Sequence, residues 1–342
     1  MSWRKHRKLA RELEEKGDYF AAAENYRMAW EKKQSKEELI YRAAENYFRL
    51  RDYRNAADAY QHVPNNYNDD QLVLLKYARA LKQDGQYEKA KTVFEQLSSS
   101  YTGPDKAILQ DIVSSEMRGI NLVRSLNTNM DRRMEILHPG IGINTEAEEF
   151  GPVSIDANTL WFTSTMGGTA RIYASQRMGR NWSKAETPAG FPVVEGGQYA
   201  HGSMSPDGQR FYFTICNNDK GWQGINTRCE IYVTKQSANG WTKPERLPDY
   251  INLDKANTTM PQVVHQAGQE YLFFASNRDG GRGGMDIWYA ARDLGLDNND
   301  FTFPVNLGPS VNTLGDELTP YYLTDEGVLY FSSNGHPGMG GF

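Results

Sequence analysis

Small, aromatic and polar residues repeat regularly through the first third of this chain. Aligned segments begin at Gly17, Arg51 and Gly85, and these starts lie 34 residues apart. The positions that agree in all three copies are Tyr19, Tyr53 and Tyr87; Ala22, Ala56 and Ala90; Tyr26, Tyr60 and Phe94; and, upstream, Ala10, Ala44 and Ala78. Small residues suit the places where two helices touch, and aromatic residues fill the space toward the next helix. The pattern therefore predicts stacked pairs of helices.

A 34-residue period with these alanines and aromatic residues resembles the tetratricopeptide repeat. The resemblance covers residues 3–98 and implies a helical solenoid. We expect one more helix, opened by Pro104 in its first turn, to cap the exposed end of the solenoid. The apolar positions of this capping helix are Ile108, Ile112, Ile120 and Val123.

The first helices of such repeats form a concave surface on which partners bind. By register with the repeat, we expect this surface to carry Arg4, Arg7, Arg11, Tyr41, Glu45, Phe48, Arg79 and Lys82. One interpretation is a groove that binds an acidic or extended peptide. The other is a solvated helix face without a ligand, because charged residues have to lie outside in any case.

The remaining two thirds of the chain repeat short apolar strands. Four of them are "LWFTS" (160–164), "FYFTI" (211–215), "LFFAS" (272–276) and "LYFSS" (329–333), and partner strands at 171–175, 230–234 and 286–290 follow the first three. A turn signal precedes each apolar strand. Aromatic and β-branched strands, turn signals and a period of about 50–60 residues are typical of a β-propeller with one four-stranded blade per repeat.

One phrase recurs between these repeats. "INTEAEEFGP" (143–152) and "VNTLGDELTP" (311–320) share their Asn, Thr, second acid and Pro, and "INLDKANTTMP" (251–261) is a looser copy. We interpret the phrase as the connector between the outer strand of one blade and the inner strand of the next, where Asn favours the turn and Pro begins a strand. We also expect "RRMEILHPGIG" (132–142) to form the outer strand of a blade that closes the ring with strands from the far end of the chain.

The fourth repeat breaks off at Phe342. We therefore expect an incomplete propeller in this chain and further chain in the native protein. The predicted architecture is multidomain, with a tetratricopeptide helical domain at 1–130 and WD-like propeller repeats at 131–342.

Three segments of the second region resemble the WD-like propeller repeats related to those of TolB: "SPDGQRFYFT", "ASNRDGGRGGMDIWYA" and "NGWTKPERLP". Helical repeats followed by such a propeller resemble the N-terminal half of the PorE-type OmpA-family envelope proteins of the type IX secretion system. The resemblance implies a periplasmic, outer-membrane-associated component of the secretion and gliding machinery, with other envelope proteins as partners. Peptidoglycan binding in that family belongs to a C-terminal domain that this sequence does not contain.

Two cysteines, Cys216 and Cys229, lie at the end of one predicted strand and the start of its partner. If the strands form a hairpin, the two Cβ atoms lie near one another, and we predict a disulfide and an oxidising compartment such as the periplasm. The alternative is two unrelated thiols. In the loop between them, Trp222 is a candidate anchor for a protein partner, with packing between blades as an equal alternative.

Composition and motifs argue against several function classes. The net charge is +3 over residues 1–130 and −8 over residues 131–342, which argues against nucleic acid as the main partner. No nucleophile elbow, P-loop or zinc-binding histidine motif is present, and the six histidines show no metal-ligand spacing. No apolar run is long enough to span a membrane. We therefore expect no catalytic residues, no metal and no cofactor.

These observations lead to a non-catalytic protein-interaction scaffold, which joins envelope parts to the cell wall, as our first functional hypothesis. The alternative is a sensor whose propeller binds a glycan or a peptide. An enzymatic function, a hydrolase or lyase on a propeller, is the least favoured hypothesis.

Overall fold

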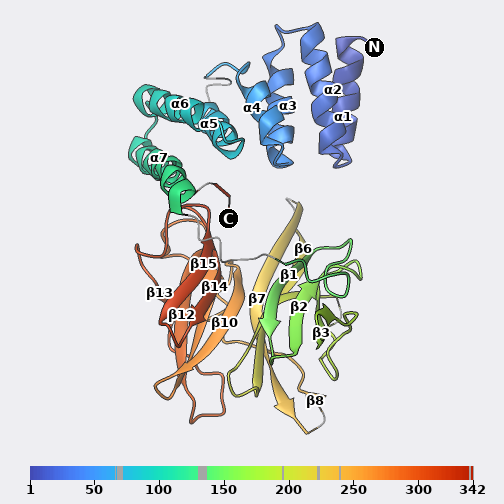
Figure 1. Ribbon diagram of the computed structural model, residues 1–342, viewed down its shortest axis with the longest axis vertical. Helices are drawn as coiled ribbons and strands as arrows, with labels where there is room; N and C mark the ends of the chain where they lie inside the picture. The colour runs from blue at the N-terminus through green and yellow to red at the C-terminus, as the bar shows by residue number, and fades with distance from the viewer. Residues whose placement is uncertain are drawn as a thin grey trace. The chain divides into compact units, whose positions relative to one another are not determined.

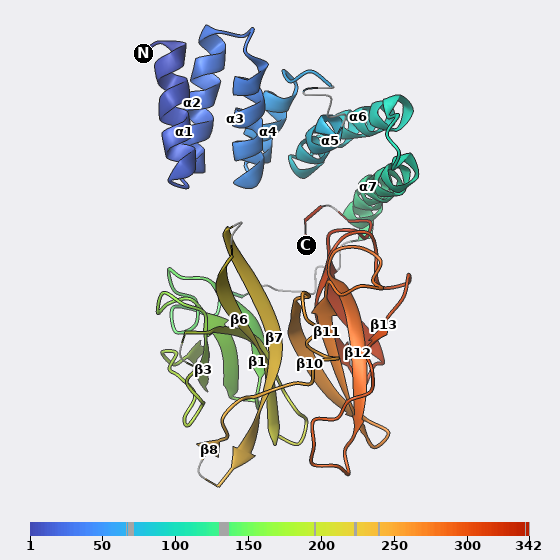
Figure 2. The same ribbon diagram turned by 180° about the vertical axis from the view of Figure 1, so that it is seen from behind.

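The computed structural model describes residues 1–65, 67, 72–129, 137–194, 196–221, 224–238, 240–338 and 340–341 (Figures 1 and 2). The chain divides into two compact units. The helical unit comprises Met1–Asp131 with His336–Gly341, and the sheet unit comprises Arg132–Gly335 with Phe342.

The helical unit is a row of antiparallel helix pairs. Its helices are α1 (Trp3–Glu15), α2 (Tyr19–Lys32), α3 (Glu37–Arg49), α4 (Tyr53–Tyr60), α5 (Val73–Gln83), α6 (Tyr87–Ser100) and α7 (Lys106–Asn129). The second helix of each pair begins at the repeated tyrosine of the 34-residue period. All six repeated alanines and the three aromatic residues that follow them are at most 1% exposed. The sequence repeat is therefore the repeat of helix contacts.

The turn within each pair has a left-handed residue at the same repeat position. Gly17, Arg51 and Gly85 have φ angles of 82°, 59° and 77°. Glycine adopts this conformation without strain, whereas a residue with a Cβ does not. Arg51 is therefore the one member of this set whose residue type opposes its backbone conformation.

Helix α7 buries a different stripe from the one that the sequence suggested. Leu109, Val113, Ile120 and Val123 are buried, whereas Ile108 is 49% exposed. The buried positions are four, seven and three residues apart, so they lie on one helix face. Our assignment of Ile108 to the packed face was wrong, because choosing the buried face among several apolar positions requires the position of the neighbouring helix.

The sheet unit consists of four successive antiparallel sheets. The first contains β1 (Glu149–Ser154), β2 (Thr159–Ser164), β3 (Arg171–Met178) and β4 (Asn181–Trp182); the second contains β5 (Gln198–Met204), β6 (Arg210–Gly221), β7 (Gly224–Ser237), β8 (Gly240–Trp241) and β9 (Glu245–Arg246); the third contains β10 (Thr258–Gln266), β11 (Gln269–Ser276), β12 (Asp286–Asp293) and β13 (Val305–Asn306); and the fourth contains β14 (Glu317–Leu323) and β15 (Val328–Ser333). Consecutive strands pair in chain order, as in propeller blades, except that β9 pairs with β7 rather than with β8. The described strands do not close into a ring (Figure 1).

Aromatic residues of the second strands join neighbouring sheets. The rings of Trp161 and Phe211 lie 5.0 Å apart between the first and second sheets. Phe273 stacks on Tyr322 at 5.5 Å between the third and fourth sheets. The aromatic residues of the apolar strands therefore pack sheet against sheet.

The first strand of every sheet has an irregularity of register at the same place. Gly151, His201, Met260 and Thr319 stand there with φ angles of 57°, 46°, 56° and 50°. The amide of His201 donates to Thr163 Oγ1 at 3.0 Å, and that of Met260 donates to Thr214 Oγ1 at 3.0 Å. A threonine of one sheet thus holds the bulge of the next sheet.

The repeated connector phrase has a common hydrogen-bond pattern. The carboxylate of Glu149 accepts from the amide and hydroxyl of Thr145 and from Ser164 Oγ. Glu317 accepts in the same way from Thr313 and from Ser333. Each glutamate therefore fastens its own connector to the second strand of the sheet that it opens.

The asparagine of the phrase fastens the connector to the preceding sheet. Asn252 binds both the amide and the carbonyl of Ile231 in β7, and Asn312 binds those of Ile287 in β12. In the looser copy, Arg278 takes over the role of the glutamate: its guanidinium donates hydrogen bonds to the backbone carbonyls of Tyr250 and Ile251. The phrase recurs because the sheets are connected in the same way.

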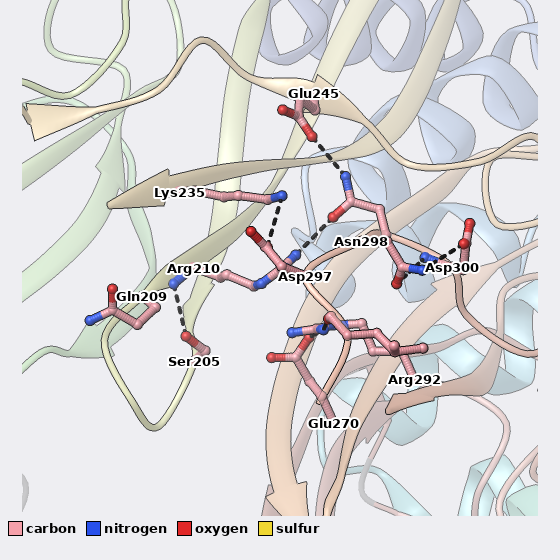
Figure 3. A network of polar contacts seen from close by, with 12 residues as sticks. Ser205, Gln209, Arg210, Lys235, Glu245, Glu270, Arg292, Asp297, Asn298 and Asp300 are labelled. Carbon is pink, nitrogen blue, oxygen red and sulfur yellow. Dashed lines mark hydrogen bonds and ion pairs between the residues drawn. The ribbon is translucent and has the colours of Figure 1, made fainter. Parts of the chain in front are cut away.

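A buried polar network joins the second and third sheets (Figure 3). Glu270 is 0% exposed, and its Oε1 accepts from Tyr212 Oη at 2.6 Å and from Arg292 Nε at 2.5 Å. Nearby, Arg210 Nη2 lies 2.8 Å from Asp297 Oδ1. The buried carboxylate is neutralised and hydrogen-bonded within the network, so we assign it a structural role between sheets.

The segment 132–142 differs from our expectation of an outer strand. Residues 132–136 lie outside the described residues, and residues 137–142 form no strand. The amide of Gly140, whose φ is 89°, donates to His138 Nδ1, and Ile143 follows in a turn. The strand prediction was wrong for 137–142, because Pro139 and Gly140 favour the turn.

Candidate functional site

Charged side chains connect the first helices of successive pairs. Between α1 and α3, Arg7 Nη2 lies 3.2 Å from Glu38 Oε2, and Arg42 Nη1 lies 3.1 Å from Glu14 Oε2. Asn46 Nδ2 also donates to Glu14, at 3.0 Å. Side chains of α3 therefore reach back to the preceding first helix.

The same arrangement continues along the unit. Between α3 and α5, Lys76 Nζ lies 2.8 Å from Glu45 Oε2. Between α5 and α7, Arg79 Nε and Lys82 Nζ each lie 2.7 Å from the carboxylate of Glu116. We call this set of cross-helix pairs, from Arg7–Glu38 to Lys82–Glu116, the ion-pair ladder.

Hydrogen bonds within the ladder shift the pKa values of Glu14 and Lys76 toward their charged forms. Partial burial acts to raise the pKa of Glu14, but hydrogen bonds from Asn46, Tyr26 and Arg42 hold it below its ordinary value. Burial and the bond to Glu14 raise the pKa of Tyr26 to about 12. Burial acts to lower the pKa of Lys76, yet its hydrogen bond with Glu45 leaves the value raised. Glu14 and Lys76 are therefore held in their charged forms by their partners on the neighbouring first helix.

Most of the predicted groove residues contact other side chains of the helical unit. Arg7, Glu45, Arg79 and Lys82 belong to the ladder, the ring of Tyr41 lies 4.7 Å from that of Tyr67, and the ring of Phe48 lies 6.2 Å from that of Tyr60. Lys82 is only 3% exposed, so it differs from our expectation of a residue on an open surface. The remaining two residues, Arg4 and Arg11, are exposed on α1.

Those two arginines take part in no ion pair among the described residues. The Arg4 guanidinium lies 5.4 Å from the ring centroid of Trp3. A shallow hollow on α1 is lined by Trp3, Arg4, Arg7, Lys8, Arg11, Glu12 and Glu15. The open part of the predicted surface is therefore basic and lies on the first helix.

Sequence reasoning missed the partners that complete the ladder, namely Glu14, Glu38, Arg42, Lys76 and Glu116. One signal was present: Lys8, Arg42 and Lys76 place a basic residue at the same position of all three copies. A charge that repeats with the helix contacts indicates a contact between repeats rather than a ligand.

In the sheet unit, Cys216 and Cys229 are joined by a disulfide. They are directly opposed in the register of β6 and β7, whose hairpin continues to Gly221 and Gly224. The predicted anchor Trp222 lies outside the described residues.

The described part of the chain contains neither a candidate metal site nor a helix that could span a membrane. No group of three or more His, Cys, Asp or Glu side chains there is placed to hold a metal ion. No described helix is both long and apolar enough to cross a membrane.

The comparison with family models found the tetratricopeptide repeat. Residues 38–69 and 72–103 match it, and these ranges contain the pairs α3–α4 and α5–α6. The pair α1–α2, which our alignment includes, is not matched. None of the curated proteins matches the chain.

Several solved structures are similar to part of the chain. An endo-arabinase from Bacteroides thetaiotaomicron is 16% identical, with a TM-score of 0.36 over 55% of this chain and 68% of the enzyme. A putative TolB from Agrobacterium tumefaciens is 18% identical, with a TM-score of 0.31 over 53% of this chain and 52% of that protein. An α-L-arabinofuranosidase from Lactobacillus brevis is 16% identical, with a TM-score of 0.33 over 56% and 65%. The chain spans about two thirds or less of these structures, and at these TM-scores they carry no argument about its activity.

Proposed function

We propose that this protein is a non-catalytic protein-interaction scaffold. The observation that carries the proposal is the first-helix face of the tetratricopeptide unit, whose side chains are fixed in advance by the ion-pair ladder. A surface that is ordered before binding loses little conformational entropy when a partner docks. The exposed Arg4 and Arg11 at one end of this face favour an acidic or extended peptide segment as the ligand.

The finer proposal is a periplasmic component of the type IX secretion and gliding machinery, associated with the outer membrane. It rests on the resemblance of the repeat order to the PorE-type envelope proteins. The Cys216–Cys229 disulfide supports it, because such bonds persist in oxidising compartments. Other proteins of the envelope machinery are the proposed partners.

Site-specific photo-crosslinking of the full chain tests the scaffold function. A photoreactive residue replaces Arg11 on the first-helix face, and a matched control replaces Glu95, which is exposed on the second helix α6. Both proteins are incubated with the envelope fraction of a bacterium that has a type IX secretion system. We expect reproducible crosslinks to secretion or outer-membrane proteins from position 11 and not from position 95.

Equal crosslinking from both positions would mean nonspecific capture and would contradict the proposal. If neither position captured a protein while a glycan or peptide array gave saturable binding that did not depend on the helical unit, the sensor hypothesis would replace the scaffold.

A further inference from the structure

Among the residues that the structure describes, one face of α1 lacks the contacts that α3 and α5 make with a preceding first helix. At one repeat position, a basic residue reaches back to a glutamate of the preceding first helix: Arg42 reaches Glu14 at 3.1 Å, and Lys76 reaches Glu45 at 2.8 Å. The equivalent residue of α1 is Lys8. Its side chain is 82% exposed, and its one ion pair among the described residues is with Glu12 of its own helix, at 3.8 Å.

A second position shows the same relation. Glu38 of α3 reaches back to Arg7 of α1, and the residue one repeat before Glu38 is Arg4. Arg4 is exposed and takes part in no ion pair among the described residues. The face through Arg4 and Lys8 is therefore the stacking face of α1, where α3 and α5 each meet a preceding helix.

The positive charge of this stacking face indicates that a partner surface would have to be acidic. The first two turns of α1 carry Arg4 and Lys8, to which no other helix of the described chain brings a carboxylate, and α1 has no acidic residue in its first turn. Basic residues at the start of a helix oppose the helix dipole, so they do not serve the stability of α1 itself. At the position of Lys8, both Arg42 and Lys76 pair with a glutamate of the preceding first helix, and at the position of Arg4, Glu38 pairs with Arg7.

We propose that the stacking face of α1 binds an acidic α-helical segment of a partner protein. The segment supplies carboxylates to Lys8 and Arg4, as Glu14 and Glu45 do for Arg42 and Lys76, and so extends the ion-pair ladder by one helix. This inference rests on the proposed scaffold function. It concerns the end face of the helical row, which shares Arg4 with the concave groove and adds Lys8.

The probe is a synthetic helix-forming peptide with glutamates one turn apart on one face, compared with the same peptide carrying glutamines. Binding to the full chain is measured by fluorescence anisotropy. We expect the glutamate peptide to bind more tightly, and its affinity to fall as salt is added. The double variant Arg4→Glu/Lys8→Glu should weaken it by roughly tenfold, because two ion pairs are lost and replaced by repulsion.

The matched control is Lys32→Glu/Lys33→Glu, which makes the same change of net charge at exposed positions of the helical unit. It should leave peptide affinity within about twofold of the wild type. The single variant Lys8→Gln keeps the test valid if the double variant unfolds, and it should weaken binding severalfold.

The inference would be overturned by equal affinity of the two peptides, by no binding of either, or by equal losses in the stacking-face and control variants. Self-association of the wild-type chain that disappears in the Arg4→Glu/Lys8→Glu variant would identify a second copy as the occupant and would also refute a partner helix. Crosslinks from position 11 that persist in the double variant, without peptide binding, would refute this inference and leave the scaffold function standing.

Discussion

Acidification should destabilise the sheet unit through one imidazole, that of His201. Burial lowers the pKa of His201 from 6.5 to about 4. Its ring lies 4.9 Å from that of Phe150, and its backbone stands in the left-handed region at the bulge of β5. The folded state therefore holds this imidazole neutral at pH values where the unfolded chain protonates it.

The sign and size follow from proton linkage. Above pH 6.5 the imidazole is neutral in both states, and it contributes no pH dependence. Between pH 6.5 and pH 4 the unfolded state binds one more proton, so the free energy of unfolding falls as pH falls. At 1.36 kcal/mol per pKa unit the full loss is about 3 kcal/mol. Because His201 keeps some exposure, we expect about 2–3 kcal/mol.

The matched variant is His201→Asn, because asparagine tolerates a positive φ and does not titrate. Urea unfolding is followed at steps from pH 7 to pH 4 by tryptophan fluorescence, which reports mainly on the sheet unit because five of the seven tryptophans lie beyond residue 160. Carboxylates that titrate in this range are common to both proteins and cancel in the difference. The wild type should lose about 2–3 kcal/mol more than the variant across this range. Parallel pH profiles of wild type and variant would refute the reasoning.

Three further perturbations test the fold. Arg51→Gly should stabilise the helical unit by about 0.5–1 kcal/mol, because relief of the left-handed strain exceeds the added flexibility of the unfolded chain. Thermal melting followed by circular dichroism measures this change. A lower melting temperature in the variant would contradict the prediction. Cys229→Ser should destabilise the β6–β7 hairpin by roughly 3 kcal/mol. The loss should appear as faster amide hydrogen exchange in both strands. Unchanged exchange would show that the hairpin does not need the disulfide. Glu317→Gln should lower the free energy of unfolding by about 2 kcal/mol, and the equivalent Glu149→Gln by less than about 1 kcal/mol. The reason for the difference is that Glu317 is fully buried, whereas Glu149 reaches water. Equal losses in chemical denaturation would contradict our interpretation of the connector.

Local sequence patterns were sufficient to predict the helices and strands of this fold. The repeated alanines and aromatic residues mark the helix contacts, because small side chains are needed wherever two helices approach closely. The four apolar strands lie where their aromatic and β-branched residues and the turn signals placed them. The connector phrase lies at the entry to three of the four described sheets. In each case the determining interactions lie within one repeat or between adjacent repeats.

The same patterns misjudged features that depend on a neighbouring element. Ile108 was as apolar as Leu109, and only the position of α7 beside the other helices decided which of them is buried. Residues 137–142 were assigned to a strand because a ring needed one, although their own proline and glycine favoured a turn.

The candidate site divides in the same way. From the repeat alone, the sequence determined that Arg4, Arg7, Arg11 and Lys82 lie on first helices and follow the period of the solenoid. Only the tertiary structure decided that Arg7 and Lys82 are held by glutamates of other helices while Arg4 and Arg11 stay open. The physical reason is that helical periodicity sets the direction of a side chain from its own helix, whereas its partner depends on which charge the next helix brings within a few ångströms.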